Sequence, residues 1–411
     1  MRRMLISLAA LLISAGILLA GGGLQGTLVS IRANMEGFSL FTIGVLSSGY
    51  YAGFIAGCLA TPGMVARAGH IRAFAALSAM AAAAALTYAL SVEITLWVSL
   101  RILTGFCFAG LYMIIESWIN EKSSNENRGQ VLSVYRIVDL TAMTIGQFLL
   151  TAADPKSFVL FSLVAVLICV SIVPVAMTKA IAPEPLAQAK LNLPKLLRVS
   201  PFAVAGALAV GLSNGAFWAI GPVYVIELGF GTGMVATFMS VAIIVGALAQ
   251  WPIGYLSDLI DRRKVLIITA LAACASGLFL SSVDASTTWM VLAGGGLYGA
   301  FAMSIFGLSA AHANDHAESN EFVIVTAGLL LIYGMGSVVG PILAPLAMNV
   351  AGAQSLFLYT AVIHSTLFGF GVIRLFVRRS LPADQQEDYV LMPKTTPGAI
   401  ELDPRNNDDY Q

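Results

Sequence analysis

Runs of about 20 mostly apolar residues recur along almost the whole chain, each long enough to cross a membrane as an α-helix. Short stretches that contain charged residues, proline or glycine separate these runs. The pattern predicts an all-α membrane protein with twelve transmembrane helices. The predicted helices cover residues 4–31, 40–61, 72–92, 95–119, 130–152, 157–180, 200–226, 233–256, 264–283, 287–311, 322–347 and 353–377.

The chain begins with a methionine, two arginines and an apolar stretch, a pattern that also occurs in secretory signal peptides. The apolar stretch, however, continues to Ile31, and further apolar runs follow it. Because this first run is long enough to span a membrane, we expect it to be an uncleaved membrane helix.

Composition excludes several classes of function. Hydrophobic residues make up 58% of the chain and charged residues 11%, whereas a soluble domain carries about 25% charged residues. The formal net charge is zero, which argues against a nucleic-acid partner. The four cysteines lie inside apolar runs, without zinc-type spacing, and no phosphate-binding loop or nucleophile–base set is visible. We therefore expect no enzyme activity, no cofactor, no metal and no ATP-driven step.

Lysine and arginine are distributed unequally between the two sets of loops, and the richer set is expected to face the cytoplasm. The poorer set holds little beyond Arg32 and Lys156. We therefore expect a multi-pass protein of the bacterial inner (cytoplasmic) membrane with both termini in the cytoplasm. The basic positions of the richer set are Arg2, Arg3, Arg67, Arg72, Lys122, Arg128, Lys179 to Arg198, Arg262 to Lys264 and Arg374 to Arg379.

One long connection, residues 181–199, divides the predicted helices into two groups of six. It is basic and contains proline, so we expect a cytoplasmic linker between an N-terminal six-helix bundle (1–180) and a C-terminal one (200–379). Residues 380–411 carry mostly acidic charges and few apolar side chains. Such a composition predicts a disordered cytoplasmic tail.

The two halves of the chain contain similar sequence segments at equivalent places. The segments GGGLQG (21–26) and GLSNG (211–215) occupy equivalent places, as do YYAGFIAG (50–57) and IIVGALAQ (243–250). A basic loop follows the second pair in each half. Paired repeats of this kind are typical of transporters whose two halves rock against each other.

Four charged residues fall at membrane depth, where each charge costs at least a few kcal/mol and usually faces a protein interior or a watery cavity. Arg101 and Glu116 lie in one predicted helix, and Arg136 and Asp139 lie in the next. Arg136 and Asp139 are three residues apart, so they can pair directly, and Arg101 or Glu116 can reach Asp139. These four residues are the candidates for proton coupling or a central cavity.

Two interpretations of these charges remain open. A carboxylate that loses and regains a proton as its arginine contact closes and opens would couple proton movement to transport. Alternatively, Arg136 and Asp139 form a permanent ion pair that fixes two helices. Glu116 has its own structural alternative, which is a brace for Arg128 or Lys122.

Uncharged polar and aromatic side chains at membrane depth extend the candidate site. On helix 130–152, Gln147 falls within an arc of about 80° that also holds Arg136 and Asp139, at about 100° per residue. Side chains of this kind either line a solute cavity or pack a polar seam. The candidates for the substrate cavity are Gln25, Tyr112, Thr144, Gln147, Asn214 and Trp218.

The histidines give weaker evidence for a functional site than the charged residues do. His312 and His316 flank a loop with several acidic residues, which is either a metal site or, as we expect, a solvated loop. His364 lies in an apolar run, where we expect a core or lipid-facing histidine whose hydrogen bonds are satisfied.

The segment GYLSDLIDRRK (254–264) resembles a loop motif of the major facilitator superfamily of transporters. The resemblance implies a conformational latch between helix ends. The related segment PGMVARAGHIR (62–72) matches less well, because Ala66 stands at the position of the acidic residue. The latch candidates are Gly254, Asp258, Arg262 and Arg263 in the first segment, and Arg67 and Arg72 in the second.

Further segments extend this resemblance over essentially all twelve predicted helices. Arg101 to Gly105 is similar to a family motif associated with proton coupling, and QWPIG (250–254) and GSVVGP (336–341) are similar to the YcaD-like branch. The glycine–proline motif that family antiporters carry on their fifth helix is absent from residues 142–150. The resemblance implies two pseudo-symmetric six-helix bundles, the major facilitator fold.

These observations favour a secondary active transporter that moves a small-molecule substrate across the inner membrane by alternating access, as a monomer in the lipid bilayer and with the proton as coupling ion. The polar stripe of the N-terminal half suits a small amphiphile, a sugar or a drug, and the direction of transport stays open. The alternative from another class is a non-transporting sensor or scaffold on the same fold.

Overall fold

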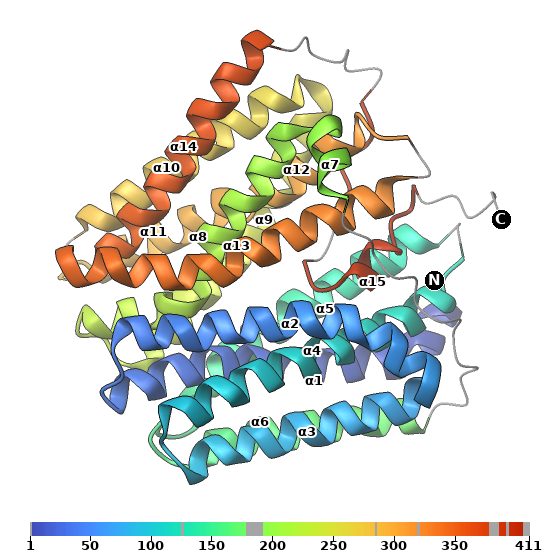
Figure 1. Ribbon diagram of the computed structural model, residues 1–411, viewed down its shortest axis with the longest axis vertical. Coiled ribbons are helices and arrows are strands. Elements are labelled where there is room, and N and C mark those ends of the chain that lie inside the picture. The colour runs from blue at the N-terminus through green and yellow to red at the C-terminus, as the bar shows by residue number, and fades with distance from the viewer. Residues whose placement is uncertain are drawn as a thin grey trace. The chain divides into compact units, whose positions relative to one another are not determined.

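A computed structural model describes residues 2–124, 127–177, 192–283, 286–318, 321–377, 386–391 and 394–405. Within these ranges, all regular secondary structure is helical (Figure 1). The elements are α1 (Arg2–Met35), α2 (Leu40–Ala68), α3 (His70–Leu90), α4 (Ile94–Glu121), α5 (Arg128–Leu149), the 3-10 turn η1 (Leu150–Ala152), α6 (Val159–Ala176), α7 (Leu193–Val199), α8 (Pro201–Glu227), α9 (Thr232–Leu259), α10 (Arg262–Ser282), α11 (Thr288–Ala302), α12 (Ile305–Asn314), α13 (Phe322–Ala351), α14 (Ser355–Val377) and α15 (Pro397–Ile400).

The predicted all-α membrane protein is confirmed for the described part of the chain. Eleven helical segments there are long and apolar enough to cross a membrane, with α11 and α12 forming one interrupted segment, Thr288–Asn314. The twelfth predicted span corresponds to α5. Its polar side chains, among them Arg136, Asp139 and Gln147, lower its hydropathy, so α5 is set apart by the residues of the candidate site.

Local chemistry fixes where several helices begin and end. The Glu93 carboxylate caps α4 by accepting hydrogen bonds from the backbone N–H of Thr95 and of Leu96, at 3.1 and 2.6 Å. The Ser200 hydroxyl caps α8 in the same way, 3.1 Å from the Ala203 nitrogen. Gly69 separates α2 from α3 at φ 80°, a conformation that glycine adopts without strain.

The contacts divide the chain into two compact units. Unit 1 comprises Met1–Glu36, Gly49–Lys190 and Met392–Gln411, and unit 2 comprises Gly37–Ser48 and Leu191–Leu391. In unit 1, α1 packs against α4, α5 and α6, and α3 packs against α4 and α6. Glycine allows α2 to approach α4 closely, because a Cβ added at Gly53 would lie 2.0 Å from the Ile102 carbonyl oxygen.

Unit 2 is built around α8, which packs against α13, α14 and α12, while α9 packs against α11 and α10 against α14. The first turns of α2 also belong to this unit, and there the Ser48 hydroxyl donates to the Val338 carbonyl at 2.6 Å. Aromatic rings fill the core of the unit in mutual contact, which supplies much of its buried apolar area. These rings are Phe217, Tyr224, Phe238, Tyr298 and Phe357.

The C-terminal tail differs from the disordered segment that its composition predicts. Over its described residues 394–405, the tail packs on unit 1, and α15 lies against α4 (Figure 1). Ala399, Ile400 and Leu402 are almost completely buried. The Thr396 hydroxyl caps α15 by accepting a bond from the Gly398 nitrogen at 3.2 Å. Local capping and a small apolar face therefore order a segment whose overall charge suggests disorder.

The predicted linker is described in part. Residues 178–191 lie outside the described residues, and with them lies most of the predicted linker 181–199. Its last residues form α7, which the Asn192 side chain caps by accepting a bond from the Lys195 nitrogen at 3.1 Å. The linker therefore ends in a helical turn that leads into α8.

Candidate functional site

A buried ion pair lies on α5, as the three-residue spacing predicts. The guanidinium of Arg136 donates through Nη1 to Oδ2 of Asp139, and the two side chains are only 12% and 9% exposed. Another donor of the same guanidinium, Nε of Arg136, has no hydrogen-bond partner among the described residues. A buried pair with one unsatisfied donor is costly, and a rearrangement that satisfies Nε would gain free energy.

Glu116 on α4 is completely buried and accepts hydrogen bonds from three hydroxyl groups. Tyr135 of α5 donates at 2.8 Å, and Thr395 and Thr396 of the C-terminal tail donate to the two carboxylate oxygens. In the described part of the chain, no ion pair joins Glu116 to Arg128 or Lys122, the partners of the bracing alternative. The hydroxyls replace the water that a buried carboxylate would otherwise need.

Arg101 lies deeper in α4 and contacts an aromatic ring. Its Cζ atom is 4.5 Å from the centre of the Tyr50 ring, and the residue is 5% exposed. This is the geometry of a cation–π contact. The carboxylates of Glu116 and Asp139 interact electrostatically within unit 1. Arg101 lies against the Tyr50 ring of α2.

The uncharged substrate-cavity candidates of unit 1 differ in whether their side chains form hydrogen bonds. Gln147 joins α5 to α1, since it accepts from the Thr27 hydroxyl at 2.7 Å and donates to the Gly23 carbonyl at 3.2 Å. Thr144 donates to a carbonyl of its own helix. The Tyr112 hydroxyl lies where a side chain on Gly22 of α1 would clash. Gln25 is buried, and its Nε2 has no hydrogen-bond partner among the described residues.

The candidates of unit 2 lie on α8 in an uncharged environment. Asn214 is buried, and its Oδ1 accepts from the Tyr298 hydroxyl at 3.5 Å. Trp218 is half-buried and packs edge-on against Phe217. The Tyr298 ring also packs on His364, which is completely buried.

His364 differs from the satisfied histidine that the sequence predicts. Neither of its ring nitrogens has a hydrogen-bond partner within the described ranges. The nearby Thr360 hydroxyl donates to the Phe357 carbonyl of its own helix and not to His364. The prediction is wrong because a polar side chain in an apolar run does not by itself bring a partner.

The latch candidates of unit 2 form an ion-pair cluster around Arg262, which is completely buried. Its Nη2 binds Asp258 of α9, and its Nη1 binds Asp315 at the end of α12. Arg262 and Asp258 stand one helical turn apart, which allows the contact. Asp258 therefore has the arginine partner that the motif implies, and Asp315 adds a second carboxylate.

The tail segment 386–391 completes this cluster through its backbone. Arg262 donates to the Glu387 carbonyl at 2.6 Å, and the Glu387 nitrogen donates to Asp315 at 3.0 Å. The Tyr389 nitrogen donates to Asp258 at 3.1 Å. The Tyr389 ring lies where a side chain on Gly254 would clash, since a Cβ there would be 2.2 Å from it. Gly254 of the motif is thus needed for close approach of an aromatic ring.

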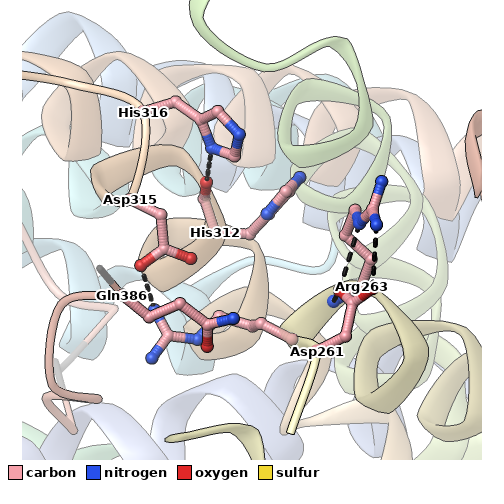
Figure 2. Close-up of a pocket in the computed structure, with 7 residues that line it drawn as sticks. Asp261, Arg263, His312, Asp315, His316 and Gln386 are labelled. Atoms are coloured by element: carbon pink, nitrogen blue, oxygen red, sulfur yellow. Dashed lines mark hydrogen bonds and ion pairs between the residues drawn. The ribbon is translucent and has the colours of Figure 1, made fainter. Parts of the chain in front are cut away.

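A small pocket lies beside the cluster (Figure 2). Arg263 pairs with Asp261 at 2.8 Å, and Nδ1 of His316 lies 2.9 Å from the His312 carbonyl oxygen. Partial burial raises the pKa of Asp261, but the hydrogen bonds and charge of Arg263 outweigh it and hold that pKa below its ordinary value. In the described ranges, no group of three or more His, Cys, Asp or Glu side chains could hold a metal ion.

The corresponding loop of unit 1 is much simpler. Arg67 and Arg72 are exposed on either side of Gly69, and no ion pair to them is present among the described residues. His70 at the start of α3 is buried instead, against Trp118 and within 3.4 Å of the Ser117 hydroxyl. The two predicted latch segments therefore differ in structure as they do in sequence.

Sequence reasoning missed five residues of these clusters. Each of them reaches its partner on another element, at sequence separations from 19 to 280 residues, so no helical spacing reveals it. A usable signal was the apolar, capped segment TTPGAI (395–400) inside a charged tail. The missed residues are Tyr135, Asp315, Tyr389, Thr395 and Thr396.

Known proteins support the architecture. Solved structures with the same fold include the nucleoside transporter NupG (TM-score 0.73, 15% identity, covering 89% of this chain and 98% of that one). The Escherichia coli fucose:proton symporter FucP has a TM-score of 0.56 at 14% identity, covering 90% of this chain and 99% of that one. Identities this low show a shared fold.

Sequence relatives cover most of the chain. An uncharacterised transporter, YcaD of Salmonella arizonae, is 24% identical over 337 residues, which are 82% of this chain and 87% of the relative. YcaD of Escherichia coli strain K12 is similar to the same extent. The family model of the Major Facilitator Superfamily matches residues 11–258 and 233–391. The protein is a multi-pass membrane transporter, not an enzyme, and it belongs to the Major Facilitator Superfamily.

Proposed function

We propose that the protein is a secondary active transporter that moves a small solute across the bacterial inner membrane by alternating access, with the proton as the coupling ion. The observation that carries the proposal is the buried Arg136–Asp139 pair beside Glu116, in a chain that belongs to a transporter family. Ionisable groups at membrane depth are costly and commonly mark proton or substrate pathways.

The coupling step is a change in the partners of Asp139. While Arg136 is in contact, the positive guanidinium favours the charged carboxylate. When the contact opens in a dry environment, the neutral carboxyl is favoured and a proton binds. Glu116 adds to this preference, because its negative charge opposes a second charge on Asp139. A fold neighbour described as a fucose:proton symporter provides a precedent on this architecture.

The solute path is proposed to run along the neutral polar side chains. In unit 1, Gln25 has an unsatisfied amide nitrogen, and the Tyr112 hydroxyl lies against α1. In unit 2, Asn214 and Trp218 offer an amide and an aromatic face on α8. Each unit therefore offers side chains that suit a small amphiphile, a sugar or a drug, bound by a few hydrogen bonds and aromatic contact.

The Arg262 cluster is proposed to bias the conformational equilibrium. Two carboxylates and a backbone carbonyl surround one buried guanidinium, so the ends of α9, α10 and α12 are held together. We further propose that the protein acts as a monomer with both termini in the cytoplasm. Reaction of a cysteine in the tail with an impermeant reagent added outside intact cells would contradict this orientation.

Transport is tested with the purified protein in proteoliposomes. A thermal-stabilisation screen first identifies a small molecule that binds, and its labelled form is then the transport probe. We expect accumulation when an inward or outward pH gradient is imposed and only equilibration without one. A ligand that stabilises the protein but never crosses the membrane would favour the alternative, a sensor or scaffold on this fold.

A further inference from the structure

The burial of Glu116 depends on the chain's own C-terminal segment. Two of its three hydroxyl donors, Thr395 and Thr396, come from the tail, and only Tyr135 comes from the helices of the bundle. Without the tail, one oxygen of the carboxylate would lose the only hydrogen-bond partner that it has among the described residues. The shielding of this carboxylate is therefore a property of a docked segment as well as of the bundle.

The rest of the segment is fitted to the same end of α4. Gly398 lies against the carboxylate, since a Cβ there would be 3.4 Å from the Glu116 Cβ and Oε2 atoms. Asn120, one turn further along α4, donates to Glu401 at 3.4 Å. Ile400 and Leu402 are buried, and α15 lies alongside α4 (Figure 1). The contacts combine an apolar face with hydrogen bonds to specific side chains, as in a built binding site.

Lys394 brings a further cation into unit 1, and its charge interacts with that of Arg136. Burial, and to a lesser extent the charge of Arg136, lowers the pKa of the Lys394 amine to about 7. The segment thus places two hydroxyls at Glu116, and its Lys394 amine interacts electrostatically with Arg136.

We propose that the Glu121 end of α4 is a binding surface whose occupant is residues 394–405 of the same chain, and that docking of this segment closes access to Glu116. Because the occupant is tethered to the bundle, its effective concentration is high and docking needs no free ligand. A short capped segment also opens more readily than a membrane helix, so the carboxylate is exposed and covered as the segment leaves and returns. The inference concerns access to Glu116 and does not depend on which solute moves.

Cysteine modification tests the docking directly. In the full-length protein with Cys58, Cys107, Cys169 and Cys274 replaced by alanine, one variant carries Ala399→Cys and another carries Pro404→Cys. Residue 399 is completely buried and residue 404 is exposed. We expect N-ethylmaleimide to modify the cysteine at 399 at least about tenfold more slowly, because the reaction requires local opening. Equal rates at the two positions would overturn the docking.

Substitution of the tail hydroxyls then tests whether Glu116 holds the segment. Thr395→Val together with Thr396→Val removes both tail donors and keeps the full chain. We expect the cysteine at 399 to react about tenfold faster, since hydrogen bonds to a charged group are the stronger kind. Thr87→Val is the matched control, because the Thr87 hydroxyl is exposed and bonds only its own helix. An unchanged rate in the double variant would refute the role of Glu116 as the anchor.

A carboxyl reagent reports on the shielding itself. Dicyclohexylcarbodiimide labels buried carboxyl groups that it can reach, and mass spectrometry locates the label. We expect little label on Glu116 in the wild-type chain and several-fold more in the Thr395→Val, Thr396→Val variant, with none at position 116 in Glu116→Gln. Equal labelling of the wild-type and double-variant chains would overturn the proposed closure. Neither readout measures transport, so this test can fail while the proposed transport function holds.

Discussion

The two units share a repeated sequence pattern but distribute ionisable groups in opposite ways. Unit 1 buries Arg101, Glu116 and Asp139 along two neighbouring helices. Unit 2 buries Arg262 and Arg263 at the start of α10, and the middle of its helices is aromatic and uncharged. The buried charges of unit 1 therefore lie along its helices, whereas those of unit 2 gather at helix ends.

The described helices of unit 2 pack together through close backbone contact, without buried charges in their middle. The glycine-rich α11 packs directly on α9, where a Cβ added at Gly299 would lie 2.1 Å from the Ala242 carbonyl oxygen. Close backbone contact of this kind stabilises helices in a bilayer without ionic groups. Unit 2 thus packs the middle of its described helices without charge, whereas unit 1 holds the residues proposed for proton coupling. The predictions below test that contrast, from the largest expected effect to the smallest.

The largest effect is expected where a buried charge loses its partner in unit 1. Arg136→Leu leaves Asp139 uncompensated and should lower stability by about 3–5 kcal/mol. The apparent melting temperature in detergent measures this. Arg198→Leu, on the exposed face of α7, is the matched control and should change little. If Arg136→Leu were as stable as the control, the pair would contribute no stability and the contrast between the units would weaken.

Unit 2 should respond to charge loss in proportion to burial. The Asp315 side chain is 2% exposed and that of Asp258 is 29% exposed, although both bind Arg262. Asp315→Asn should therefore cost about 2–3 kcal/mol and Asp258→Asn about 1 kcal/mol, read from melting temperatures. Asp258→Asn should also slow transport while substrate affinity stays within a few fold. Unchanged transport in that variant would contradict the latch.

A smaller effect, of opposite sign, is expected at His364. Because neither ring nitrogen is paired among the described residues, His364→Leu removes an unsatisfied polar group and should stabilise the protein by about 1 kcal/mol. Phe357→Leu, in the same core, should destabilise it by contrast. A clear loss of both melting temperature and transport in His364→Leu would show that unit 2 uses this histidine in another state.

The smallest effect is a pH dependence of tail docking. The pKa of Lys394 falls from its ordinary value to about 7 when docked, so the undocked segment binds more protons between about pH 7 and pH 10. Docking should therefore strengthen as pH rises through this window. Arg136 is a charged group that acts on the Lys394 amine. The docked segment also contacts Glu116, another titratable group, through its threonines. The segment itself carries Glu401, Asp403 and Arg405.

The measurement is the maleimide rate at a cysteine in position 399, divided at each pH by the rate at 404. This ratio should fall several-fold between pH 7 and pH 9, and Lys394→Met should flatten it. A ratio that rises with pH in the wild-type tail would contradict the assignment to Lys394.

How far the sequence predicts this structure depends on sequence separation. Helix positions follow from apolar runs, and the Arg136–Asp139 and Asp258–Arg262 contacts follow from one-turn spacing. The partners of Glu116 do not, because Thr395 lies 279 residues away in a segment whose charge suggests disorder. Short-range chemistry can be predicted from a single sequence, whereas tertiary contacts decide which predicted site residues meet.

The central claim is that Asp139 is the proton-sensitive carboxylate, and one measurement tests it most directly. Asp139→Asn mimics the neutral carboxyl, so reconstituted protein should lose accumulation driven by a pH gradient. It should still bind the probe solute and exchange labelled for unlabelled solute, because those steps need no net proton movement. The double change Arg136→Leu with Asp139→Leu removes both charges together, so no buried charge is left without a partner. If the pair is purely structural, this variant should fold and transport normally; if Asp139 carries the proton, it should lose gradient-driven accumulation. Full gradient-driven accumulation by either variant would contradict the account and leave the pair as a purely structural contact.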